Sequence, residues 1–406
     1  MPLRWGDRVG IGASRLSRRL GRSGGIIAGR IALATDKAAL QRLAADAQAV
    51  LVSGTNGKST TTVMLADAWS RTVEVASNIG GANMPDGLVA ALLDRPGSRH
   101  AVLEVDEPHL PGVLGQVYPD VVVLLNLTRD QLDRVGETWR LADRIQRGLA
   151  AHPDTVVVAN ADDPNVVWAA RTAGRRVWVS AGAAWTGDSM TCPHCGDLLW
   201  REARRWGCAQ CGLSRPDPHW ELHDDRLAGP AGQDLVLRPG LPGAMNRSNA
   251  AFVVAAADVL GVSQCAAMAA IEEIREVHGR YRIVERHPHR VRLLLAKNPA
   301  GWQQMLELLA VGKAPIVLAV NARQADGRDP SWLWDVPFEQ LAGRELVAVG
   351  ERAEDVSVRL TYAGLTHRVA ADPEAGLELL AAGPVDLIGD YTSLLDTASL
   401  LRRGLR

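Results

Sequence analysis

The residues best suited to chemistry form a glycine-containing loop between an apolar run and a stretch that favours a helix. Val50-Leu51-Val52-Ser53 is followed by Gly54-Thr55-Asn56-Gly57-Lys58-Ser59-Thr60. Glycines let backbone N–H groups curl around phosphate oxygens, and a helix N-terminus favours negative charge. Lys58 can reach the β- and γ-phosphates of a nucleotide, and the Ser59 hydroxyl can ligate Mg²⁺. The loop therefore predicts that residues 54–60 bind ATP with Mg²⁺.

One position departs from the general phosphate-loop pattern. That pattern has a glycine where this chain has Val52. A chance match in an ordinary loop is the alternative, and the expected passage from strand to helix argues against it. The loop indicates a nucleotide and leaves the type of reaction open.

Further polar residues follow the other apolar runs. The run 101–103 leads into Glu104-Val105-Asp106-Glu107, and later runs lead into Asn126-Leu127-Thr128-Arg129-Asp130 and Asn160-Ala161-Asp162-Asp163. Ligands bind at the carboxyl edge of parallel sheets, where a carboxylate can hold Mg²⁺ against a phosphate. Glu104, Asp106 and Glu107 are the three candidates for that ligand. Taken singly, each segment could be an ordinary polar loop.

The elements that must position these residues alternate between strand and helix. Buried strands are expected at 49–52, 101–105, 121–125 and 156–159, and again at 291–296, 315–320, 345–349 and 385–388. We expect an α/β protein in which 46–278 is a central phosphate-loop domain with a parallel sheet. Residues 279–406 would form a Rossmann-like α/β domain.

Residues 1–45 are rich in arginine and are predicted to be helical, with a break at Gly24-Gly25. Their segment 15–20 could touch anionic lipid at a membrane surface, or it could be a solvated helix face. No apolar run is long enough to span a bilayer and no signal peptide is evident. We therefore expect a cytoplasmic location, with the inner face of the membrane as an alternative place within it. The net charge of −1 argues against a nucleic-acid partner.

Four cysteines interrupt the central domain at 189–216. They form two C-x-x-C pairs, Cys192 with Cys195 and Cys208 with Cys211, each followed by a glycine. Two such knuckles are typical of a tetrahedral Zn²⁺ site; disulfides or a redox pair are the alternatives. A closed four-thiolate site makes the zinc structural. The fifth cysteine, Cys265, sits in an alanine-rich stretch and reads as a core residue.

The ordered motifs G-T-N-G-K-S-T, L-E-V-D-E, N-L-T-R-D-Q-L-D-R, N-A-D-D-P, N-R-S-N-A and G-R resemble the Mur ligase superfamily over residues 46–406. Members activate a carboxylate as an acyl phosphate and join an amine to it. The resemblance places Asn246 near the adenine and Arg280 on the nucleotide. It also implies that Lys58 and Glu104 serve catalysis, with Ser59 and Glu104 on Mg²⁺.

The sequence departs from the superfamily in three places. The usual N-terminal domain for a uridine nucleotide has no counterpart in residues 1–45, Gln131 replaces a histidine, and no lysine stands for the carbamylated one near 141–149. Asp143 could supply a metal-binding oxygen instead.

Within the superfamily, three features resemble the MurT family: the cysteine insert, the segment Lys297-Asn298-Pro299-Ala300-Gly301 and the segment 326–332. Members of that family are the synthetase subunits of lipid II isoglutaminyl synthase. This resemblance implies amidation of the D-glutamate α-carboxylate of lipid II, with ammonia from a GatD-like glutaminase in a heterodimer. Asp329 would orient the glutaminase histidine across the interface, or would be a helix N-cap. Two alternative functions are open. The chain could be a ligase that adds an amino acid, of the folylpolyglutamate or cyanophycin synthetase type, or a zinc-ribbon NTPase that depends on nucleic acid.

Overall fold

The computed structural model describes residues 3–19, 26–130, 137–182, 186–277, 279–310, 312–323 and 328–403. It divides into two compact units. The first contains 1–128, 137–240 and 245–274, and the second contains 129–136, 241–244 and 275–406. The predicted break at Gly24-Gly25 and the substituted Gln131 lie outside the described residues.

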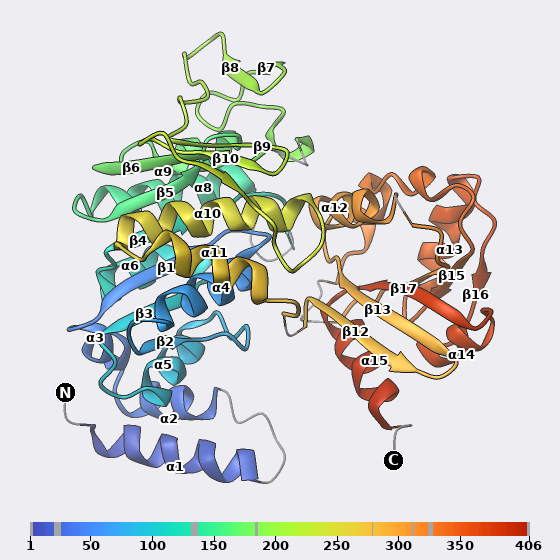
Figure 1. The fold of residues 1–406 in the computed structure, drawn as a ribbon, viewed down its shortest axis with the longest axis horizontal. Helices are drawn as coiled ribbons and strands as arrows, with labels where there is room; N and C mark the ends of the chain where they lie inside the picture. The colour runs from blue at the N-terminus through green and yellow to red at the C-terminus, as the bar shows by residue number, and fades with distance from the viewer. Residues whose placement is uncertain are drawn as a thin grey trace. The chain divides into compact units, whose positions relative to one another are not determined.

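A nine-stranded sheet forms the centre of the first unit, in the order β11-β10-β9-β6-β5-β4-β1-β3-β2 (Figure 1). Its strands from β2 to β9 pair in parallel, and β10 and β11 add an antiparallel edge. The strands are β1 (Gln48–Ser53), β2 (Val75–Ser77), β3 (His100–Glu104), β4 (Val121–Leu124), β5 (Val156–Asn160), β6 (Arg175–Ser180), β9 (Trp220–His223), β10 (Arg226–Ala228) and β11 (Asp234–Val236). The predicted α/β class is confirmed.

Helices cover both faces of this sheet, as right-handed crossovers require. In Figure 1, α10 and α11 cross one face together with α4, and α4 packs against α11. On the other face α8 packs against α6 and α9. The helices are α4 (Lys58–Ser70), α5 (Pro85–Asp94), α6 (Leu110–Val117), α8 (Thr138–Ala150), α9 (Pro164–Ala170), α10 (Ala244–Leu260) and α11 (Gln264–Glu273), with a 3-10 turn η1 (Glu107–His109).

The chain order across this sheet creates the site for the loop. β1 pairs with β3 on one side and with β4 on the other, so the chain reverses direction across the sheet at β1. Ligands of open α/β sheets bind at such a reversal, outside the carboxyl ends of the strands. The loop after β1 lies at that point.

Three helices precede the sheet: α1 (Trp5–Arg19), α2 (Ile27–Thr35) and α3 (Ala39–Ala44). The prediction that this segment is helical is confirmed. No helix in the described ranges is long and apolar enough to cross a bilayer.

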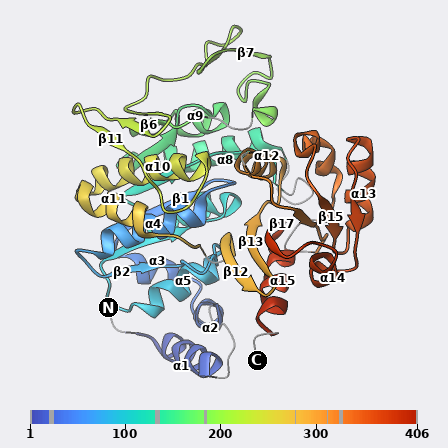
Figure 2. The ribbon, with the colours of Figure 1, turned by 45° about the vertical axis from the view of Figure 1, so that its right-hand side comes forward.

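A small ribbon is inserted between β6 and β9. It contains the turn η2 (Gly187–Ser189) and the antiparallel pair β7 (Leu199–Glu202) and β8 (Arg205–Cys208). The ribbon follows β6, and its strand β7 lies away from the sheet (Figure 2). The chain then returns to pair β9 beside β6.

A six-stranded sheet forms the second unit, in the order β12-β13-β17-β14-β15-β16, parallel except for β12. Its strands are β12 (Tyr281–Arg286), β13 (His289–Leu295), β14 (Ile316–Ala319), β15 (Leu346–Val349), β16 (Arg368–Val369) and β17 (Gly383–Gly389). Its helices are α12 (Pro299–Leu309), α13 (Ala353–Tyr362), α14 (Pro373–Glu378) and α15 (Tyr391–Arg403), with 3-10 turns η3 (Ser331–Asp335) and η4 (Phe338–Leu341). The four strands predicted here match β13, β14, β15 and β17.

Candidate active site

The phosphate loop needs glycine at two positions. Gly54 has φ of +141° and Gly57 has φ of +89°, both in the region that L side chains rarely adopt. A Cβ at Gly54 would also lie 2.9 Å from the Leu125 Cβ, and one at Gly57 would collide with the Asn249 amide oxygen. Val52 is buried within β1 opposite Glu104, so the strand continues through the position where the general motif has glycine.

Asn126, which follows β4, holds the loop in shape. Its carbonyl accepts a hydrogen bond from the Thr55 N–H (2.9 Å). Its side chain accepts from the Asn56 N–H (2.8 Å) and donates to the Asn56 carbonyl (2.9 Å). The Thr55 hydroxyl accepts from the Thr128 N–H at 3.0 Å. The loop therefore receives its conformation from the neighbouring strand before any phosphate binds.

Lys58 is buried at the start of α4 among carboxylates. Its Nζ lies 2.6 Å from the Glu107 Oε2 and 3.5 Å from the Asp106 Oδ1. Burial lowers the pKa of Lys58, but Glu107, Asp106 and Glu104 outweigh this effect and raise the pKa above its ordinary value. Lys58 is therefore a fixed positive charge, and a nucleotide phosphate would compete with Glu107 for it.

Each of the two predicted Mg²⁺ ligands has a buried oxygen atom without a hydrogen-bond partner among the described residues. Glu104 is fully buried; its Oε1 accepts from Asn83 (3.2 Å), and its Oε2 has no hydrogen bond within the described residues. The Ser59 hydroxyl is likewise buried and unpartnered there. Such groups are costly without a partner, and a hard cation prefers oxygen ligands. These two residues fit Mg²⁺ and would hold it.

The Asn78 side chain fixes the backbone around Glu104. Its amide accepts from the Glu104 N–H and donates to the Glu104 carbonyl, both at 2.8 Å. Asn78 and Asn83 both lie between β2 and α5. Neither residue was predicted from the sequence as part of the site. The position of Asn78 directly after a short strand, at the carboxyl edge of the sheet, could have indicated it.

The remaining predicted nucleotide residues lie on two units. Thr60 is buried in the first turn of α4. Asn246 is buried on α10, and Asn249 donates to its side chain at 3.4 Å. Asn249 thus lies between Asn246 and the loop at Gly57. Asn249 was not predicted from the sequence, although its position three residues after Asn246 on one helix places both side chains on the same face. Arg280 lies in the second unit just before β12, in a shallow depression that Tyr281 and Leu394 help to line.

Asp143 lies on α8 and forms an ion pair with Arg147 one turn along the same helix, at 3.0 Å. Its role as a metal ligand stays a hypothesis. Asp130 forms an ion pair with Lys297, and Arg129 with Asp335 (3.1 Å), all within the second unit.

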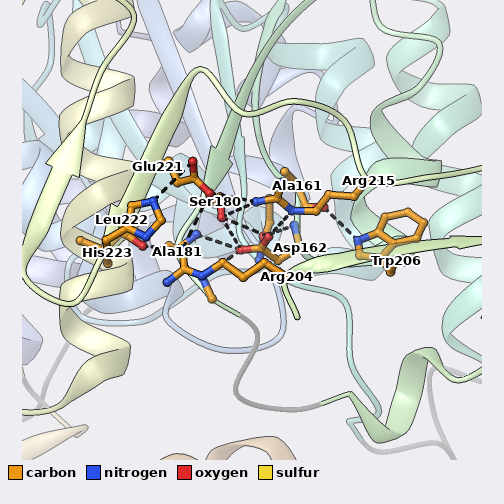
Figure 3. A network of polar contacts seen from close by, with 12 residues as sticks. Ala161, Asp162, Ser180, Ala181, Arg204, Trp206, Arg215, Glu221, Leu222 and His223 are labelled. Carbon is orange, nitrogen blue, oxygen red and sulfur yellow. Dashed lines mark hydrogen bonds and ion pairs between the residues drawn. The ribbon is translucent and has the colours of Figure 1, made fainter. Parts of the chain in front are cut away.

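Asp162 and Arg215 join the cysteine ribbon to the sheet (Figure 3). The Arg215 Nε donates to the Asp162 Oδ1 at 2.8 Å, and its Nη2 donates to the Ser180 hydroxyl at 2.7 Å. From the ribbon, the Trp206 indole N–H donates to the Ala161 carbonyl at 3.1 Å. The N-A-D-D-P segment, which the sequence suggested as part of a ligand site, therefore anchors the insert.

The adjacent Asp163 points the other way, toward the loop. It accepts from the N–H groups of Asn165 (2.8 Å) and Leu127 (2.8 Å), which caps α9 and fixes the residue after Asn126. Burial raises the pKa of Asp163 to about 6, against the lowering effect of these hydrogen bonds. Neighbouring residues thus connect the ribbon to the phosphate loop.

The four ribbon cysteines come together as the spacing predicts. Their sulfur atoms all lie within 4.8 Å of one another. The Cys192 and Cys211 sulfurs are 3.6 Å apart, and those of Cys195 and Cys208 are 3.4 Å apart. Gly196 and Gly212 adopt positive φ and donate to the carbonyls of Cys192 and Cys208. The set fits Zn²⁺, which these thiolates would hold. Cys265 is exposed on α11, so its reading as a core residue is wrong.

Asp329 lies at the entry to η3. Its carboxylate accepts from the Ser331 N–H and from the Ser331 hydroxyl, both at 2.9 Å. The side chain is exposed. Trp332 packs against Trp302 with ring centroids 6.3 Å apart, which fixes the turn in the second unit. The cap contact is thus present, and the exposed carboxylate remains accessible to a partner.

Comparison with known proteins gives consistent matches along the chain. The Mur ligase middle domain model matches residues 52–189, and the MurT ligase C-terminal model matches 295–394. The Streptococcus pneumoniae lipid II isoglutaminyl synthase (glutamine-hydrolyzing) subunit MurT is 32% identical, covering 85% of this chain and 83% of that protein. The Staphylococcus aureus subunit of the same name is 30% identical, covering 96% of each. A pseudomurein peptide ligase type C from Methanothermus fervidus shares the fold (TM-score 0.69, 17% identity, 89% of this chain and 79% of that one).

The two unpartnered oxygens give a test of the metal site. We expect Glu104→Gln and Ser59→Ala each to raise the Mg²⁺ concentration for half-maximal ATP hydrolysis by more than about tenfold, at least the loss seen when outer-shell partners of a metal are removed. Thr62→Val is the matched control, because the Thr62 hydroxyl is also buried on α4 and unpartnered in the described structure. An equal Mg²⁺ shift in Thr62→Val would contradict the assignment.

The ribbon makes a separate prediction. The purified chain should contain one Zn²⁺, measured by elemental mass spectrometry, and Cys208→Ser should lose it and lower the unfolding temperature, since metal binding contributes to folding. Cys265→Ser is the control and should keep both zinc and stability. Full zinc content in Cys208→Ser would refute a four-thiolate site.

Proposed function

The chain belongs to the MurT family, and on that premise we propose that it is the ATP-dependent synthetase subunit of a lipid II isoglutaminyl synthase. It would amidate the α-carboxylate of D-glutamate in the lipid II stem peptide to give D-isoglutamine, a step of peptidoglycan synthesis. The observation that carries this proposal is similarity along nearly the whole chain, second unit included. Likeness in the first unit alone would support only carboxylate activation.

The geometry of the first unit supports the activation step. In this step a carboxylate oxygen of D-glutamate attacks the γ-phosphorus of ATP, and ADP leaves. Lys58 carries a permanent positive charge at the loop and would neutralise the charge that builds up on the transferring phosphoryl group. Glu104 and Ser59 would hold Mg²⁺, which polarises the phosphate oxygens when bound. Asn126 keeps the loop N–H groups in place.

The second step needs ammonia, which attacks the acyl carbon and expels phosphate. Within the described structure no cysteine side chain hydrogen-bonds a histidine side chain, and four of the five cysteines belong to the ribbon. A glutaminase therefore belongs on another chain, in agreement with the word subunit in the relatives' names. A GatD-like glutaminase is our proposed partner, with lipid II as the shared substrate.

Asp329 is our proposed contribution to that partner's active site. A carboxylate that accepts from the histidine of a Cys–His pair fixes its tautomer and orientation. Asp329 is exposed and its backbone is held by the η3 turn, so it is available to a neighbouring chain.

The proposed reaction is tested with the purified chain, a GatD-like glutaminase, lipid II, ATP and either glutamine or ammonium. We expect the lipid II mass to fall by the difference between a hydroxyl and an amino group, with one ADP formed per amide. An amino-acid ligase would instead add a residue mass when glutamate is supplied. Activity only with an amino acid would refute the proposal.

Substitution of Asp329 separates its two roles. Asn at 329 can still accept from the Ser331 N–H, so Asp329→Asn keeps the cap and removes the charge. We expect glutaminase turnover of the complex to fall by orders of magnitude, toward the roughly 10⁴-fold loss known for such an Asp→Asn change. Ammonium-driven amidation should persist. Ser331→Ala is the control: it removes one cap contact of Asp329 and should keep glutamine hydrolysis. Unchanged glutamine hydrolysis in Asp329→Asn would show that Asp329 serves only as the cap.

A further inference from the structure

The outer face of α1 combines apolar and basic side chains. Trp5 is 73% exposed, Leu16 is 59% exposed and Val9 is 39% exposed. These residues recur at helical spacing and form one exposed stripe. Arg8 and Arg15 are exposed beside that stripe. We call this set of five side chains the α1 outer face.

The inner face of α1 is fixed tightly to the first unit. Gly10 lets the helix approach α2, where a Cβ would lie 2.7 Å from the Ala28 carbonyl oxygen. Asp7 is 1% exposed and forms an ion pair with Arg42 of α3 at 3.0 Å. α2 in turn packs on α5, and α1 is the outermost of these layers in Figures 1 and 2. The outer face is therefore presented in a fixed orientation.

The charge on this helix is segregated. Asp7 is the one carboxylate between positions 5 and 19, and it points inward to Arg42. Nearby carboxylates on adjacent elements are also paired with arginines: Asp36 with Arg42 and Arg4, and Asp86 with Arg30. The outer face thus carries positive charge with no acidic side chain on α1 to balance it.

We propose that the α1 outer face binds the surface of a bilayer that contains anionic lipid. A helix lying in the interface inserts its apolar side chains at the level of the headgroups, while flanking arginines pair with lipid phosphates. Exposed tryptophan is favoured at that depth. A protein partner would be expected to need a contiguous packed patch. Gly12, by contrast, leaves the middle of this stripe without a side chain, and a Cβ built there would meet no atom within 4 Å.

The inference goes beyond the proposed reaction and does not depend on it. If the reaction proceeds on a lipid-linked substrate, however, the α1 outer face would hold the first unit at the surface where that substrate lies.

The test uses the full chain without ATP, partner or lipid II, so that its result is independent of the amidation assay. Binding to vesicles of phosphatidylglycerol and phosphatidylcholine is measured by co-sedimentation, with pure phosphatidylcholine vesicles for comparison. We expect binding to the anionic vesicles that weakens with salt. Arg8→Glu should weaken it by more than about fivefold, since a basic residue near such a surface contributes about that factor and the new charge is repelled.

Two further variants complete the design. Trp5→Ser with Leu16→Ser should also lose binding while the circular dichroism spectrum is unchanged. Arg175→Glu is the matched control: it makes the same change in net charge at an exposed residue at the start of β6 and should bind as the original chain does. Equal binding by the α1 variants, equal loss in Arg175→Glu, or no binding to anionic vesicles would each overturn the proposal.

Discussion

The balance of charge around Lys58 is the constraint on which the active site depends. A buried ammonium group needs negative partners, and the end of β3 supplies Glu107 and Asp106 within 3.5 Å. Glu104, on the same segment, keeps one oxygen unpartnered within the described structure. The segment thus holds the Lys58 ammonium group beside the loop, and it leaves one carboxylate oxygen of Glu104 without a hydrogen bond in the described residues. In the proposed site, the ATP phosphates would be the anion that faces Lys58, and Mg²⁺ would be the cation that faces Glu104.

Support for the loop comes from its neighbours in the sheet. Asn126 holds the backbone of Asn56, Asp163 holds Leu127, and Asp162 holds Arg215 of the ribbon. Each contact comes from the residues that follow a strand, so the order of strands in the sheet decides which side chains can meet. The ribbon is therefore packed onto the same edge of the sheet that carries the loop 54–60, although the two segments lie far apart along the chain.

Sequence reasoning succeeded where one short motif determines local geometry. The strand-to-helix turn at 54–60, the gathering of the four cysteines and the eight predicted strands were predictable, because glycine positions, C-x-x-C spacing and apolar runs have few alternative structural explanations. That the loop binds a nucleotide stays a prediction. It missed β9–β11, whose short strands at the sheet edge carry mixed polar residues. It also missed Asn78, Asn83 and Asn249, because a supporting amide acts through tertiary contacts that leave no local pattern. The prediction that Cys265 is a core residue was wrong for a similar reason, because the sequence of an alanine-rich helix does not show which of its faces is exposed.

The position of the ribbon has a consequence for how the sheet assembles. β6 and β9 are neighbours, yet the chain between Ser180 and Trp220 makes a long excursion before β9 can pair. Closing a long flexible loop costs conformational entropy, and that cost is lower when its middle is already tied together. Four thiolates gathered on one ion would shorten the flexible path, and this would lower the entropic cost of adding the last three strands.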